Sequence, residues 1–394
     1  MTPGASVAAL AERVDTLLAR RNEAGAAFYE QQADRIARLC HRMAERFARG
    51  GRLVAFGASP AARSDARHVA VEFVHPVIVG KRALPAIGIT GDGGALATQA
   101  RLILHADDIA LAFGDAPDAI AEARARGCLA VDLPRDFPLP GEDPFVHQEL
   151  LETLYHVLWE LVHVYLEHQG LLEGRRPRTT HDAGASSFLY PFLAEQETDL
   201  EAIVADVRRS VLMKADEVAA LREQTLGEGR GRLVAASRDL RARLDAGGTV
   251  FALGNGGSAT DAMDLVADLR YPPHAWPHRR ALDLTEDTAI ITAVANDVGF
   301  EAIFARQVIA YGRPGDIVVA LTTSGGSGNV LAALAEARRR GLGTLALVGY
   351  DGGRILADGL ADHVIVSRSE HIPRIQEAQA SACHVLRELI ELAT

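Results

Sequence analysis

The sequence has few cysteines, no long apolar run and no excess of basic residues. Its cysteines, Cys40, Cys128 and Cys383, are far apart and form no CxxC pair. They indicate neither a disulfide framework nor a cysteine zinc site, and they fit a reducing cytoplasm. The N-terminus has no signal-peptide core and no apolar run approaches membrane-spanning length, so we expect a soluble, unexported protein. The formal net charge of −11 argues against a nucleic-acid-binding surface, which needs clustered Lys and Arg.

At 394 residues the chain has room for two ordinary domains, and its 48% hydrophobic content with 24% charged residues is typical of a globular protein. Residues 5–49 carry two apolar stripes at helical spacing, which predict two helices. Apolar strand patterns then alternate with helical patterns, which predicts parallel sheets covered by helices. In the first half the expected strands span 52–56, 84–90, 108–113 and 129–133.

One glycine-rich stretch organises the second half. An apolar strand over residues 249–253 runs into Gly254-Asn-Gly-Gly-Ser258 and then into a helix. Glycines let the backbone bring its N–H groups close to an anion, Ser258 adds a hydroxyl, and the helix N-terminus adds a partial positive charge. The stretch predicts a phosphate cradle, although a glycine cluster alone fits a tight turn without a ligand equally well.

A second loop of the same kind, Thr322-Thr-Ser-Gly-Gly-Ser-Gly-Asn329, follows a buried strand over 316–321. Two such loops at the ends of parallel strands form one crevice. The loops contain hydroxyls but no lysine of the Walker type, which favours a phosphorylated small molecule over a nucleoside triphosphate with its metal. The residues expected to anchor the phosphate are Asn255, Gly256, Gly257, Ser258, Thr322, Thr323, Ser324 and Ser327.

Short motifs stand in a fixed order along the second half: GNGGS at 254–258, ANDVGF at 295–300, GRPGD at 312–316, TSGGS at 323–327, GYDGG at 349–353 and RIQE at 374–377. In order and spacing they resemble the sugar isomerase (SIS) domain, and most of all the phosphoheptose isomerases, over residues 200–394. The resemblance implies conversion of sedoheptulose 7-phosphate to a heptose phosphate through an enediol. The alternative is a non-catalytic SIS protein that senses a phosphosugar or serves as a scaffold.

The first half of the sequence repeats the order of elements in the second half. Residues 65–72 align without a gap with 261–268, and the expected strand at 84–90 falls on 279–285. We therefore expect two tandem SIS-type copies, of which the first is degenerate because it has lost nearly all the glycine and serine signatures. The resemblance implies two three-layer αβα domains with parallel sheets, flanked by helices that form a bundle. The predicted parts are a degenerate domain at 1–169, a linker at 170–193 and an SIS domain at 194–394.

The resemblance also implies a zinc and acid–base set. Phosphoheptose isomerases carry a His and a Glu four residues apart on one helix, and a Gln and a His eight apart on the last helix. The matching residues of the first copy are His68, Glu72, Gln148 and His156. Those of the second copy are Asp264, Asp268, Gln376 and His384, a weaker metal set because aspartate is one methylene shorter than glutamate. The alternative for the first copy is a surface helix pair with a core histidine.

Isomerisation needs a base near C1 and C2 and an acid at the carbonyl oxygen. The candidate base is Glu72 or Asp268, and the candidate acid is His156 or His384. We expect Gln376 to contact the substrate, and Asp287 to lie near sugar hydroxyls or to cap a helix.

In the first copy Asp115 would repel phosphate, so that copy keeps the metal set without a phosphate loop. A site composed of both copies is therefore one hypothesis. A fused pair of copies also suggests a homodimer that stands in for a tetramer of single-domain subunits.

Overall fold

The protein is described by a computed structural model that covers residues 6–77, 81–167 and 199–393. The predicted linker at 170–193 lies outside the described residues. By residue contacts the chain divides into two compact units, residues 24–216 and residues 1–23 with 217–394, which we call the N-terminal unit and the C-terminal unit. The division falls inside two long helices, α1 (Val7–Ala48) and α8 (Leu200–Arg222), so residues 1–23 group with the C-terminal part of the chain.

The N-terminal unit contains a four-stranded parallel sheet. Its strand order is β2 (Ala86–Ile89), β1 (Leu53–Phe56), β3 (Ile109–Ala112), β4 (Leu129–Asp132). Successive residues of each strand point to opposite faces of the sheet. On one face they belong to a hydrophobic core that also contains residues of α1, α8, α2 (Pro60–Val74) and α6 (Pro144–Glu167), and on the other to a core shared with α3 (Leu96–Ile103) and α4 (Pro117–Ala125).

Three helices of the N-terminal unit form the expected bundle. The hydroxyl of Tyr29 on α1 donates to the backbone oxygen of Leu150 on α6 at 3.2 Å. Lys214 of α8 forms a buried ion pair with Glu160 of α6. The prediction of two helices within residues 5–49 is wrong, because α1 is one continuous helix of 42 residues. It contains no proline and only one glycine, Gly25, which costs an interior helix position about 1 kcal/mol and does not break it.

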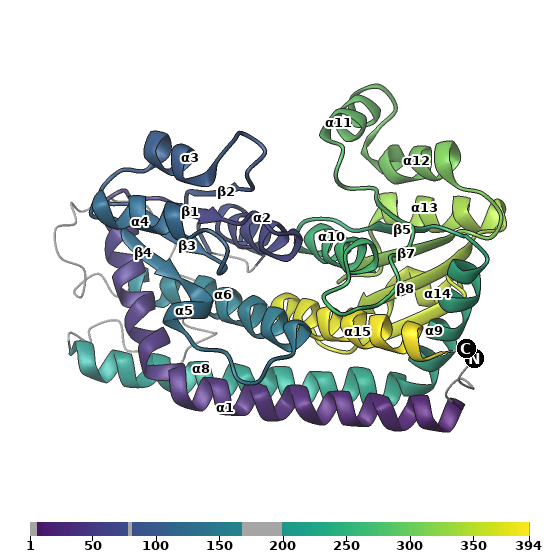
Figure 1. The fold of residues 1–394 in the computed structure, drawn as a ribbon, viewed down its shortest axis with the longest axis horizontal. Helices are drawn as coiled ribbons and strands as arrows, with labels where there is room; N and C mark the ends of the chain where they lie inside the picture. Colours follow the sequence, from purple (N-terminus) through teal and green to yellow (C-terminus); the bar gives the residue numbers. More distant parts are fainter. Residues whose placement is uncertain (1–5, 78–80, 168–198, 394) are drawn as a thin grey trace. The chain divides into compact units, whose positions relative to one another are not determined.

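The C-terminal unit contains a five-stranded parallel sheet (Figure 1). Its strand order is β6 (Ala281–Asp283), β5 (Val250–Leu253), β7 (Ile317–Thr322), β8 (Gly343–Gly349), β9 (His363–Ser367). One face packs on α9 (Gly229–Asp245), α10 (Gly257–Arg270) and α15 (Ile372–Leu392), in a hydrophobic core that also contains residues from the start of α1. The other packs on α12 (Ile303–Tyr311), α13 (Gly328–Arg339) and α14 (Gly353–Ala357).

The two sheets repeat one topology. The order β2-β1-β3-β4 corresponds strand by strand to β6-β5-β7-β8, and β9 is an addition to the second sheet. Each sheet has helices on both faces, so each unit has the three αβα layers that the sequence predicts. The fold class is confirmed. Within the described residues, no helix combines the length and the apolar content that crossing a membrane requires.

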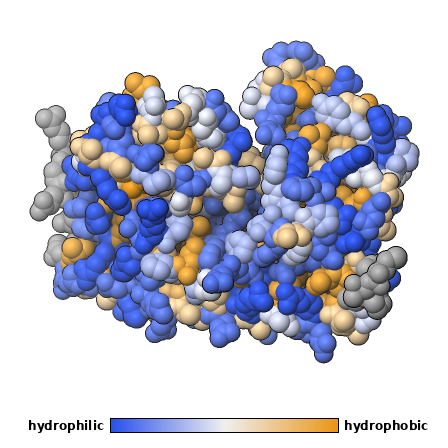
Figure 2. All heavy atoms as spheres, in the orientation of Figure 1, coloured by the Kyte–Doolittle hydropathy of each residue, from blue (hydrophilic) through white to orange (hydrophobic). Residues whose placement is uncertain are grey.

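The helix α11 (Thr288–Asp297) stands out from the rest of the C-terminal unit, because none of its residues is buried. Exposed Val298 and Phe300 follow it directly. Figure 2 shows apolar side chains, in orange and tan, among polar ones at the top right of the view, where α11 lies in Figure 1. In contrast, the strands β5 and β7, which carry the glycine-rich loops, are completely buried.

Candidate functional site

The first glycine-rich loop connects β5 to α10 in the C-terminal unit. Gly254 cannot carry a side chain, because a Cβ there would lie 2.3 Å from the backbone oxygen of Ser258. Gly256 has a φ of +58°, which favours glycine. Among the described residues, the backbone N–H groups of Asn255, Gly256 and Gly257 have no hydrogen-bond acceptor. The loop therefore has the free donors at a helix N-terminus that a phosphate cradle needs.

The second loop connects β7 to α13, and its hydroxyls shape its backbone. Thr322 Oγ1 accepts a hydrogen bond from the N–H of Gly325 at 3.3 Å, and Ser324 Oγ accepts one from Gly326 at 3.2 Å. Ser327 is the N-cap residue of α13, but its side chain makes no capping hydrogen bond. The O–H groups of Thr322 and Ser324 and the whole hydroxyl of Ser327 thus remain able to donate to an anion.

An asparagine pair joins the two loops, and sequence reasoning assigned it no such role. Asn255 Nδ2 donates to Asn329 Oδ1 at 3.0 Å, and Asn329 Nδ2 donates back to Asn255 Oδ1 at 2.8 Å. Asn329 is buried. The two loops therefore lie side by side, as the sequence predicts. The only available signal was the polar side chain of Asn329 at the buried start of α13.

An acid–base pair lies where α10 meets α15 in the same unit. His384 Nε2 is 3.6 Å from Asp268 Oδ2, and both residues are buried. Burial raises the pKa of Asp268 to about 6, while His384 and Arg387 act in the opposite direction. Such a carboxylate is ionised near neutral pH and can still accept a proton, which suits a general base.

The other two residues of this set have different surroundings. Gln376 is buried two turns before His384, and its Oε1 has no hydrogen-bond partner among the described residues. Asp264 is half-buried one turn before Asp268. Within the part of the chain that the structure describes, no third carboxylate, histidine or cysteine joins Asp268 and His384 closely enough to share an ion. Asp268 and His384 thus lie as a pair, and metal binding by the residues of the second copy stays a prediction.

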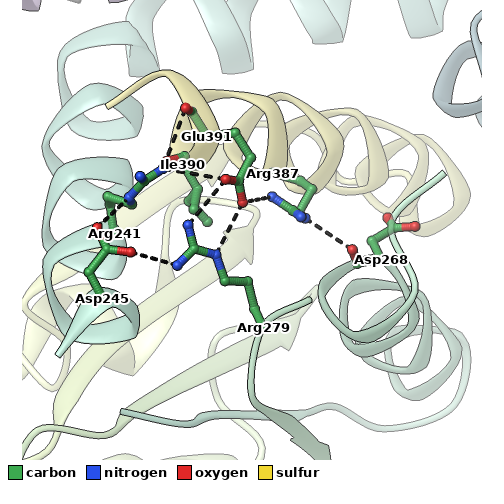
Figure 3. A network of polar contacts seen from close by, with 7 residues as sticks. All are labelled: Arg241, Asp245, Asp268, Arg279, Arg387, Ile390 and Glu391. Atoms are coloured by element: carbon green, nitrogen blue, oxygen red, sulfur yellow. Dashed lines mark hydrogen bonds and ion pairs between the residues drawn. The ribbon is translucent and has the colours of Figure 1, made fainter. Parts of the chain in front are cut away.

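Arg387 of α15 contacts the backbone of Asp268 at the end of α10 (Figure 3). Its side chain is completely buried, and its Nε donates to the backbone oxygen of Asp268 at 3.0 Å. Its Nη1 forms an ion pair with Glu391, which also pairs with Arg241 and Arg279. This network ties the end of α10 to α15 and holds a positive charge beside the candidate base.

The N-terminal unit brings together three of the residues expected to bind metal. His68 Nε2 lies 3.3 Å from His156 Nε2 and 3.8 Å from Glu72 Oε1. The three residues are buried, and their ligand atoms lie within 4.8 Å of one another. Burial, and then the nearby His156, hold the pKa of His68 well below its ordinary value. A neutral imidazole is the form that binds metal, so this buried N/N/O set fits zinc.

Two further residues lie around this set. The Tyr155 hydroxyl is 2.9 Å from His68 Nδ1, so it can orient the ring in the way that partners of metal-bound histidines do. Gln148 is buried on α6, two turns before His156. Trp159 is buried one turn after His156. The alternative that His68 and Glu72 form a surface pair is wrong, because both side chains are buried.

Asp287 serves as the N-cap of α11. Its carboxylate accepts a hydrogen bond from the N–H of Ile290 at 3.0 Å, which is the helix-capping role considered for it. This contact accounts for an acidic residue at the position without any ligand. Its proximity to sugar hydroxyls stays a prediction.

Comparison with known proteins places these features in context. The family model of the SIS domain matches residues 215–349. The phosphoheptose isomerase of Pelodictyon phaeoclathratiforme is 44% identical over 177 residues, which cover 44% of this chain and 83% of the relative. That of Paramagnetospirillum magneticum is 46% identical over 164 residues, or 41% of this chain and 81% of the relative. The structure of tagatose-6-phosphate ketose/aldose isomerase from Escherichia coli matches 100% of this chain and 95% of its own, with a TM-score of 0.55 and 13% identity, which shows a common fold.

Proposed function

The chain belongs to the SIS domain family as a relative of the phosphoheptose isomerases, and from that membership we propose that it converts sedoheptulose 7-phosphate to D-glycero-D-manno-heptose 7-phosphate. It is a phosphosugar isomerase. The observation that carries the proposal is the pair of glycine-rich loops, joined by Asn255 and Asn329, in the same unit as the Asp268–His384 pair. In this proposal the two glycine-rich loops anchor the phosphate, and Asp268 and His384 transfer the protons.

The distance along α10 between the first glycine-rich loop and Asp268 favours a long substrate. Ser258, in the first turn of α10, and Asp268 are ten positions apart, which is about 15 Å along a helix. An extended seven-carbon sugar phosphate suits this separation better than a short phosphosugar does. Gln379 of α15 donates to the backbone oxygen of Thr322 at 3.2 Å, so the helix that carries His384 also contacts the second loop. Gln376, with its unpartnered buried oxygen, is proposed to bind a sugar hydroxyl.

The proposed reaction moves protons between the two reacting carbons. The carboxylate of Asp268 removes a proton from C1 of the ketose, and His384 donates a proton to the oxygen on C2, which gives the enediol. Delivery of a proton to C2 and removal of the proton from the oxygen on C1 then give the aldehyde. The buried network around Arg387 holds Asp268 in place during both transfers.

Zinc is the proposed cofactor, and His68, Glu72 and His156 would hold it, with Gln148 as a weaker oxygen ligand. A bound zinc ion supplies a Lewis acid that polarises a carbonyl oxygen. In this arrangement Glu72 and His156 are the alternative candidates for base and acid. A cytoplasmic location and a homodimer stay predictions.

An assay of turnover decides between the two acid–base pairs. Conversion of sedoheptulose 7-phosphate is followed by ³¹P NMR for the wild type and for the Asp268→Asn and Glu72→Gln variants. We expect Asp268→Asn to lose activity by about 100-fold or more, the usual contribution of a general base. The control is Asp358→Asn, which removes an exposed carboxylate of a surface ion pair and should stay within about twofold of wild type. Full activity of Asp268→Asn with loss in Glu72→Gln would assign the chemistry to the N-terminal unit.

A further inference from the structure

The turn between β1 and α2 is the counterpart of the first phosphate loop in the N-terminal unit. It keeps the same tight geometry, because a Cβ on Gly57 would lie 1.9 Å from the backbone oxygen of Ala62, much as one on Gly254 would meet Ser258. The turn also leads into the N-terminus of a 15-residue helix, α2. The backbone needed to hold an anion is therefore retained, although the glycine and serine signature is not.

In this unit the anion-binding groups are already occupied by the protein itself. Asp115, from the loop between β3 and α4, accepts hydrogen bonds through Oδ2 from the N–H of Ala58, at 2.9 Å, and from the N–H of Ser59. The Ser59 hydroxyl in turn accepts from the N–H of Ala62 at 3.4 Å, and Pro60 has no N–H to offer. The N–H groups of Ala58, Ser59 and Ala62 are thus used within the chain.

The C-terminal unit differs at the equivalent position. The loop between β3 and α4 corresponds in strand order to the loop between β7 and α13, so in each unit the second loop reaches the first. In the C-terminal unit the connection is the neutral Asn255–Asn329 pair, which leaves the N–H groups of residues 255–257 without an acceptor among the described residues. In the N-terminal unit the connection is the carboxylate of Asp115, which accepts hydrogen bonds from the N–H groups of Ala58 and Ser59.

From this contrast we propose that Asp115 is an internal substitute for a ligand phosphate, and that it restricts phosphosugar binding to the C-terminal loops, one molecule per chain. The inference extends the proposed function, which supplies the C-terminal anchor. A carboxylate oxygen accepts the same N–H groups at a helix N-terminus that a phosphate oxygen would. A phosphate that approached the N-terminal turn would find the N–H groups of Ala58 and Ser59 taken and would meet a like charge.

The first test is the binding stoichiometry of the full-length wild type. Isothermal titration with sedoheptulose 7-phosphate should give one molecule per chain, and two molecules per chain would overturn the proposal. The Ser258→Ala, Ser327→Ala double variant should bind at least tenfold more weakly. A site of wild-type affinity that survives in this variant would also overturn the proposal, because it would lie outside the C-terminal loops.

The second test removes the carboxylate. In titrations with inorganic phosphate, followed by the thermal unfolding temperature, Asp115→Ala should gain a phosphate-dependent stabilisation larger than that of wild type. Asp118→Ala removes a nearby exposed carboxylate in the first turn of α4 and should respond as wild type does. Asp115→Asn keeps an oxygen that can accept both N–H groups, so it should fold normally and gain less than Asp115→Ala.

An equal phosphate-dependent stabilisation of Asp115→Ala and Asp118→Ala would overturn the proposal, because it would show that Asp115 does not block phosphate binding at the turn between β1 and α2. These results are separable from the proposed function. If wild type binds no phosphosugar, the C-terminal anchor is refuted, whereas the gain in Asp115→Ala still reports on the N-terminal turn.

Discussion

Gly325 in the second loop offers a sharp test of the anchor, because the structure dictates glycine there for two separate reasons. Its φ is +61°, and a Cβ at this position would lie 2.5 Å from the backbone oxygen of Gly352. Its neighbour Gly326 has neither constraint, since its nearest contact would be 3.9 Å away, at the backbone oxygen of Ser324. Gly325→Ala and Gly326→Ala are therefore a matched pair of the same chemical change.

The expected cost of Gly325→Ala follows from the two constraints. A left-handed backbone costs a residue with a Cβ about 1–2 kcal/mol, and a methyl group forced against backbone adds about 1–3 kcal/mol. Together these lower the unfolding temperature by about 10 °C for a unit of this size. The displaced loop also moves the hydroxyls of Thr322 and Ser324, so we expect the KM for the phosphosugar to rise about tenfold, which is about 1.4 kcal/mol.

The assay compares thermal unfolding and phosphosugar kinetics of the two variants with wild type. Gly326→Ala should unfold within about 2 °C of wild type, because its Cβ makes only an ordinary van der Waals contact. Equal unfolding temperatures for Gly325→Ala and Gly326→Ala would refute the description of the loop. Reduced stability of Gly325→Ala with an unchanged KM would instead show that this loop does not bind the substrate.

Three further predictions concern the acid–base pair and the metal set. Because Asp268 acts as a base only when ionised and its pKa is about 6, kcat/KM should fall about tenfold per pH unit below pH 6. Arg387→Met removes a positive charge that lowers the pKa of Asp268, so the acidic limb of that profile should move up by about one pH unit, and Arg387→Lys should move it less. Elemental analysis should find zinc in wild type and in His384→Ala but not in His156→Ala, and zinc in all three would place the metal elsewhere.

The parts of the fold that sequence reasoning predicted are those that local chemistry determines. The strands of both sheets follow from short buried runs between helices, and the loop at 254–258 follows from glycines that its backbone requires. The continuous α1 was missed because an apolar stripe that shifts around a helix resembles two helices, whereas Gly25 alone is too weak a signal to end one.

The parts that sequence reasoning missed depend on contacts between distant residues. Asn255 and Asn329 are 74 positions apart, and nothing near either residue indicates the reciprocal pair. Arg387 reads as an ordinary charge on an amphipathic helix, yet it is completely buried. Asp115 was expected to repel phosphate, but only the structure reveals that it accepts hydrogen bonds from the turn between β1 and α2.

The central claim is that this chain interconverts a ketose phosphate and an aldose phosphate by proton transfer through an enediol. The most direct measurement is incubation of the wild type with sedoheptulose 7-phosphate in D2O, followed by NMR and mass spectrometry of the sugar phosphates. We predict an aldoheptose 7-phosphate that carries deuterium at C2, and no such product with Asp268→Asn. Recovery of unlabelled, unconverted sedoheptulose 7-phosphate from a protein that binds it would contradict the claim.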